Sequence, residues 1–78
     1  MNWTELRPLL RKQYGDKINF FNDKYRSGTR RVKIYGMDPN KIKRFIRKQD
    51  PNLIVNDYDW MYGGGIRTIK CVVVNFSE

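Results

Sequence analysis

The chain has 78 residues, 16 Lys and Arg against 8 Asp and Glu, and a formal net charge of +8 at pH 7. This length allows one small domain, residues 1–78, and a composition that is 40% hydrophobic and 14% aromatic argues against intrinsic disorder. Residues 7–48 hold 14 basic but only 3 acidic residues, and so local an excess predicts a negatively charged partner.

The first fifteen residues predict an amphipathic helix. Apolar residues recur at helical spacing: Trp3, Leu6, Leu9, Leu10 and Tyr14. Asn2 and Glu5 have the spacing of a capping box, which places the helix start beside them. Proline is tolerated only in the first turn, so Pro8 leaves a later start, at Thr4 or Arg7, open.

Residues 17–36 predict two strands around a turn at Ser27-Gly28. The side chains expected to face the core are Ile18, Phe20, Val32 and Ile34. The same alternation turns Arg31, Lys33 and Tyr35 outward together. The second strand should therefore carry a basic and aromatic row on the face opposite the core.

A second, strongly basic helix is predicted in "DPNKIKRFIRKQDP". Asp38 can cap it, Pro39 suits its first position, and Asp50-Pro51 should end it. Its apolar stripe comprises Ile42, Phe45 and Ile46, and its cations are Lys41, Lys43, Arg44, Arg47 and Lys48. We expect the narrow apolar stripe of this helix to pack on the core, and most of the remaining helix surface to be cationic.

Two further strands are expected at residues 52–62 and 66–76, joined by Gly63-Gly64-Gly65. The order helix, strand, strand, helix, strand, strand indicates an α+β fold. We expect a four-stranded, mostly antiparallel sheet with both helices on one face and the other face open.

Tyr58, Trp60 and Tyr62 have period 2, so they share one face of their strand with Ile54. We expect these rings to form a buried comb under the helices, because a small domain needs their large apolar area. The alternative is a stacking platform for unpaired bases on the open face, with Trp60, and Tyr35 of the earlier strand, as candidate stacking residues.

Catalysis is not expected. Asp57 and Asp59 are an incomplete metal-ligand set, there is no histidine to act as a general base, and the aspartates should pair across the strands with Arg67 or Lys70. Cys71, in the apolar stretch "IKCVVV", should be a small buried hydrophobe. We therefore predict no enzyme activity, no metal site and no cofactor, and "GGG" is not a phosphate-binding loop.

The sequence shows no signal-peptide pattern and no apolar stretch long enough to span a bilayer. The basic helix has few large apolar residues and no tryptophan, which disfavours binding to a membrane surface. We expect a cytoplasmic protein.

The stretch "SGTRRVKIYGMDPNKIKRFI" resembles the small α+β modules of phages and mobile elements known as large polyvalent protein associated domains. The resemblance covers about the first fifty residues, as helix, "SGT" turn, strand, Asp-Pro and helix, with "GMDP" in place of a glycine-proline join. It implies a phage or plasmid accessory protein and assigns no functional residue.

The sequence predicts a non-catalytic protein that binds nucleic acid through its phosphates. The principal contacts are expected at Lys41, Arg44, Arg47 and Lys48, with Arg30, Arg31 and Lys33 as a second row and Lys43, Arg26 and Arg11 as further candidates. The alternative is a small inhibitor or regulator whose cationic surface docks on an acidic host protein. DNA or RNA, sequence specificity and oligomeric state stay open.

Overall fold

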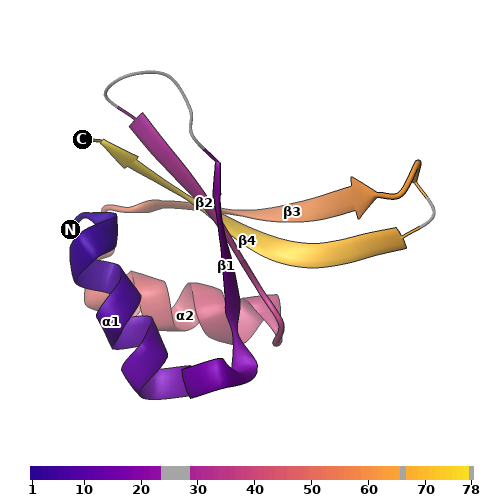
Figure 1. The fold of residues 1–78 in the computed structure, drawn as a ribbon. Helices are drawn as coiled ribbons and strands as arrows, with labels where there is room; N and C mark the ends of the chain where they lie inside the picture. The colour runs from indigo at the N-terminus through magenta and orange to yellow at the C-terminus, as the bar shows by residue number, and fades with distance from the viewer. Residues whose placement is uncertain (24–28, 66, 78) are drawn as a thin grey trace.

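The computed structural model of the chain describes residues 1–23, 29–65 and 67–77. Its elements are α1 (Trp3–Tyr14), the short 3-10 helix η1 (Gly15–Lys17), β1 (Asn19–Asp23), β2 (Thr29–Tyr35), α2 (Pro39–Gln49), β3 (Ile54–Tyr62) and β4 (Arg67–Ser77) (Figure 1). This is the predicted order. The expected turn at Ser27-Gly28 and the candidate cation Arg26 lie outside the described residues.

The capping box of α1 forms as predicted. The Asn2 side chain accepts a hydrogen bond from the Glu5 backbone N–H at 2.9 Å, and the Glu5 carboxylate accepts one from the Asn2 N–H at 3.0 Å. The helix therefore starts at Trp3, and Pro8 lies inside it, so the later start is wrong. Thr4 and Pro8 are both exposed, so the carbonyl that proline leaves unbonded lies on the solvent side, where it does little harm.

Helix α2 begins and ends where its sequence signals predict. Asp38 accepts a hydrogen bond from the Asn40 N–H at 3.0 Å, Pro39 takes the first turn, and the Asp50 N–H closes the helix on the Ile46 carbonyl at 2.9 Å. Ile42 and Ile46 are buried, so the predicted apolar stripe docks.

The four strands form one antiparallel sheet in the order β1-β2-β4-β3. Its covered face packs against both helices, and the core comprises Trp3, Leu6, Leu10, Ile18, Val32, Ile34, Ile42, Ile46, Val72, Val74 and Phe76. In this core, residues of α1 and α2 pack with residues of β2 and β4 and with Ile18, which immediately precedes β1. The two helices therefore lie on the same face of the sheet (Figure 1). The predicted α+β architecture is confirmed.

Strand β4 lies in the middle of the sheet but is paired on both sides over only part of its length. Its pairing with β2 stops at Ile34 opposite Val72, whereas its pairing with β3 continues to Tyr62 opposite Arg67. Residues 58–62 and 67–71 therefore form a two-stranded arm that extends past the helices (Figure 1). The predicted glycine turn closes the arm, with positive φ at all three glycines.

The expectation of an aromatic comb under the helices is wrong for Tyr58 and Trp60, and the Tyr62 side chain lies outside the described part of the chain. Tyr58 and Trp60 lie opposite Cys71 and Ile69 in the register, on the helix-free face, whereas the covered face of β3 carries Val55 and the aspartates. Alternation determines which residues share a face. It does not determine which face the helices cover. Here that face follows from the register, which places Val72 and Val74 of β4 beside the buried Ile34 and Val32 of β2.

Candidate functional site

The outward side of α2 presents four exposed cations, which we call the basic face: Lys41, Arg44, Arg47 and Lys48. Within residues 1–23, 29–65 and 67–77, none of the four has a carboxylate at ion-pair distance. Cations on a helix that have no carboxylate partner form a suitable binding surface for a polyanion, because the helix fixes their positions and no ion pair neutralises their charges.

Two shallow hollows flank Arg44. One, of about 390 Å³, is lined by Asn40, Lys43, Arg44 and Arg47. The other, of about 260 Å³, is lined by Tyr14, Lys41, Arg44, Phe45 and Lys48 and lies where the end of α1 meets α2. Each hollow is bordered by nitrogen donors, so each can accept an anionic oxygen from solvent.

Lys43 differs from the other cations of α2. Its Nζ donates a hydrogen bond to Asp57 Oδ2 at 2.8 Å, and its side chain is 16% exposed. Lys43 therefore fastens α2 to β3 and is less available to a ligand than the basic face. Asp57 consequently does not pair across the strands: its register partner is Val72, and only Asp59 lies opposite a basic residue, Lys70.

Arg11, another candidate for binding, has a structural role. Its guanidinium donates to the carbonyls of Gly15 and Ile18, both at 2.8 Å, and its Cζ lies 4.4 Å from the centroid of the Phe20 ring. These contacts close the turn between α1 and β1. They hold the guanidinium half-buried, so the expectation that Arg11 is a phosphate contact is not supported.

The expected second row of cations is divided between the two faces of the sheet. Arg30 lies opposite Phe76 on the covered face, whereas Arg31 and Lys33 lie opposite Asn75 and Val73 on the helix-free face. Lys33 is only 6% exposed. The second row is therefore not a continuation of the basic face, because strand alternation separates its members and ring packing encloses one of them.

The helix-free face instead carries a group of aromatic side chains, which we call the ring cluster: Phe21, Tyr35, Tyr58 and Trp60. The Trp60 ring centroid lies 4.9 Å from that of Phe21 and 5.7 Å from that of Tyr35. Sequence reasoning named Tyr35 and Trp60 but missed Phe21. The signal was present, since Phe21 alternates with the inward-facing Phe20.

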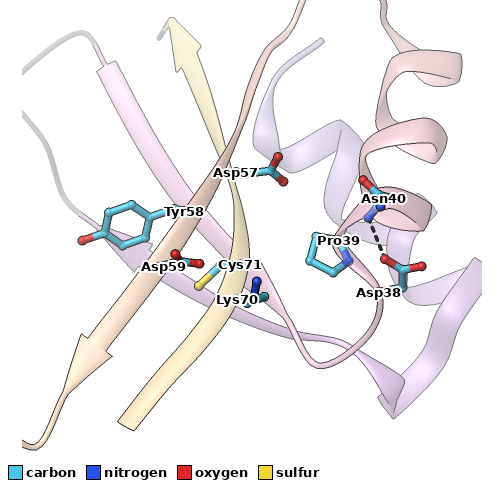
Figure 2. A pocket seen from close by; sticks show the side chains of 8 residues that line it. All are labelled: Asp38, Pro39, Asn40, Asp57, Tyr58, Asp59, Lys70 and Cys71. Carbon is cyan, nitrogen blue, oxygen red and sulfur yellow. Dashed lines mark hydrogen bonds between the residues drawn. The ribbon is translucent and has the colours of Figure 1, made fainter. Parts of the chain in front are cut away.

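A hollow of about 420 Å³ lies between the start of α2 and the base of the arm (Figure 2). Asp38, Asp57 and Asp59 line it, but the first caps α2 and the second binds Lys43. No group of three metal-ligating side chains occurs in the described part of the chain.

Cys71 also lines this hollow, and its thiol is buried. Burial raises the pKa of the Cys71 thiol above its ordinary value of 9.0, and Sγ donates a hydrogen bond to the Ile69 carbonyl at 3.4 Å. The thiol therefore stays protonated at neutral pH, which is the state of a small buried hydrophobe and not of a nucleophile.

Comparison with protein-family models, with curated proteins and with solved structures finds no match to this chain. The resemblance to the phage and mobile-element modules thus stays a prediction. Neither described helix has the length and apolar character needed to cross a lipid bilayer.

Proposed function

We propose that the protein is a non-catalytic nucleic-acid-binding protein whose basic face on α2 contacts phosphates. The observation that carries the proposal is the set of four exposed cations with no described carboxylate at ion-pair distance. The sequence pI of about 9.9 adds a favourable long-range field. The resemblance to phage and mobile-element modules supports an accessory role in such an element.

The spacing of the cations suits a phosphate backbone. Lys41, Arg44 and Lys48 follow one another at i, i+3 and i+7, so they lie along one side of the helix over a rise of about 10 Å. Contacts of this kind hold a nucleic acid in place without reading its bases. We therefore propose binding that depends strongly on salt and weakly on sequence.

The test is the salt dependence of binding to a labelled DNA duplex, measured by fluorescence anisotropy. Counterion release contributes about 0.9 to the log–log slope for each phosphate neutralised, so four contacts give a slope of about −3.6. The triple variant Arg44→Ala/Arg47→Ala/Lys48→Ala should lose about 2.7 of that slope.

The matched control is Lys12→Ala/Lys17→Ala/Lys70→Ala, which removes the same charge from exposed lysines outside α2. It should keep most of the slope. An equal loss in both triple variants would mean that net charge and not the basic face carries binding. No binding by the wild type at about 50 mM salt would overturn the proposal.

The alternative, an inhibitor that docks on an acidic host protein, predicts a different result from affinity capture. A protein partner that stays bound to the wild-type chain after nuclease treatment, and is lost with the Arg44→Ala/Arg47→Ala/Lys48→Ala variant, would favour the inhibitor. Loss of all partners on nuclease treatment favours nucleic acid.

A further inference from the structure

The helix-free face differs in chemistry from an ordinary exposed sheet face. Its described side chains combine aromatic rings with the cations Arg31, Lys33 and Arg67, and Asp23 holds the register position opposite Arg31 at the edge. Two of its rings are among the most exposed large hydrophobic side chains of the molecule, Phe21 at 41% and Tyr58 at 38%.

The ring cluster joins strands that are not neighbours. Phe21 is on β1 and Trp60 is on β3, the two edges of the sheet, yet their ring centroids are 4.9 Å apart. Three strand spacings of about 4.8 Å separate these edges in a flat sheet. The two side chains therefore lean toward each other from opposite edges, and their rings meet over the central strands of the helix-free face.

A buried cation lies beneath these rings. The Nζ of Lys33 is 4.6 Å from the Trp60 ring centroid, 5.2 Å from that of Tyr58 and 5.3 Å from that of Phe21. The Cζ of Arg31 lies 5.3 Å from the Tyr58 centroid. Ring faces stabilise such cations, so cationic groups and aromatic rings are in direct contact on this face.

This combination favours one class of ligand. An apolar protein surface would gain nothing from a buried ammonium beneath the rings, and a chain of phosphates alone would gain nothing from the rings. A single-stranded nucleic acid has both negative charge and flat unpaired bases. A duplex does not fit, because its bases are already stacked and paired.

We propose that the ring cluster is a second binding site, which stacks unpaired bases of a single-stranded nucleic acid on the exposed rings of Phe21 and Tyr58 and on the half-buried ring of Trp60. Arg31 and Lys33 attract the backbone electrostatically. The site lies on the opposite face of the sheet from α2, so this inference does not rest on the basic face, and either site can fail alone.

The experiment compares three ligands of equal length, about 20 nucleotides: single-stranded DNA, an abasic sugar-phosphate chain, and duplex DNA. The protein carries Arg44→Ala/Arg47→Ala/Lys48→Ala, so that phosphate binding at α2 does not mask the second site. We expect single-stranded DNA to bind more tightly than the abasic chain and the duplex. Equal affinity for single-stranded DNA and the abasic chain would overturn the proposal.

Ring variants in the same background identify the site. Tyr58→Ala should weaken single-strand binding about 5- to 150-fold and leave binding of the abasic chain unchanged, while Tyr58→Phe, which keeps the ring, should bind like its parent. The control is Met61→Ala, because Met61 is 65% exposed on the other face of the same strand. Unchanged single-strand affinity in a folded Tyr58→Ala protein, or an equal loss with Met61→Ala, would overturn the assignment.

Discussion

The two faces of the sheet are formed by alternate residues of the same strands, but they differ in burial and in chemistry. On the covered face, Val32, Ile34, Val72 and Val74 are fully buried under α1 and α2. On the helix-free face, the exposed rings of Phe21 and Tyr58 and the half-buried ring of Trp60 pack around the buried Lys33. Most of the apolar burial that stabilises the fold therefore lies on one face and the exposed rings lie on the other. Substitutions on the covered face should mainly change stability, and those on the helix-free face should mainly change binding.

The largest effect on stability should come from the covered face. Leu10 is fully buried, so Leu10→Ala should lower the free energy of unfolding by about 2 to 5 kcal/mol, enough to unfold much of so small a domain. Urea denaturation followed by circular dichroism measures it. Leu9→Ala is the matched control, because Leu9 is the neighbour of Leu10 in α1 but is only half-buried. An equal loss of stability in both variants would contradict the assignment of Leu10 to the core.

Trp60→Ala tests the helix-free face. We expect a loss of about 1 to 2 kcal/mol, because Trp60 packs on Phe21 and Tyr35 and stacks on Lys33 but is not enclosed by a helix. Thermal and urea unfolding measure it beside Leu10→Ala. A loss as large as that of Leu10→Ala would show that the ring cluster is a second core of equal weight.

The contact between α2 and β3 should matter less. Lys43 and Asp57 form an ion pair of 2.8 Å, but the Asp57 side chain is 66% exposed, so solvent screening reduces the coupling to about 0.2 to 1 kcal/mol. A double-mutant cycle with Lys43→Ala and Asp57→Ala measures it. The coupling should shrink in high salt, and a salt-independent value would mean that the two substitutions act through packing instead.

The smallest effect concerns the contact between the start of α1 and the end of α2, where the Met1 amine donates to Asp50 Oδ2 at 2.8 Å. That bond holds the pKa of Asp50 below its ordinary 3.8 and the pKa of the amine above its ordinary 8.0. The Asp50 contribution to stability is complete above pH 3.8 and is lost as pH falls through the folded value. The amine contribution is complete below pH 8.0 and is lost as pH rises through the folded value.

Asp50→Asn should therefore flatten the pH dependence of the unfolding midpoint at both ends of the range. Asp16→Asn, at an exposed site in η1, is a control that should leave the profile nearly unchanged. A profile for Asp50→Asn that matches the wild type would show that the bond does not persist in solution.

Local signals in the sequence predicted most of the fold. The capping box at Asn2 and the Asp38-Pro39 start of α2 are short-range patterns, and the structure reproduces both. The face on which Trp60 lies is not determined by local sequence, because it depends on which strand becomes the central one. One signal was available: the run of four apolar residues at 71–74 is typical of a strand covered on both sides, which indicates that β4 is the centre.

The candidate site was less accessible to sequence reasoning. The outward direction of Arg44 and Arg47 followed from helical periodicity, and the structure places both in solvent. The enclosure of Lys33 did not follow, because it depends on rings of β1 and β3 that reach across the sheet to a lysine on β2. Side chains that act through a tertiary contact have no pattern along the chain to reveal them.

The central place of β4 also orders the steps of folding. The β3–β4 hairpin closes across three glycines and needs only local contacts, whereas β2 meets β4 across α2 and all of β3. Long-range pairing of this kind is slow, because a large loop must close before any contact forms. During synthesis β1, β2 and α2 precede the strand that completes their sheet, so the edge of β2 that pairs with β4 has no partner strand until β4 has left the ribosome.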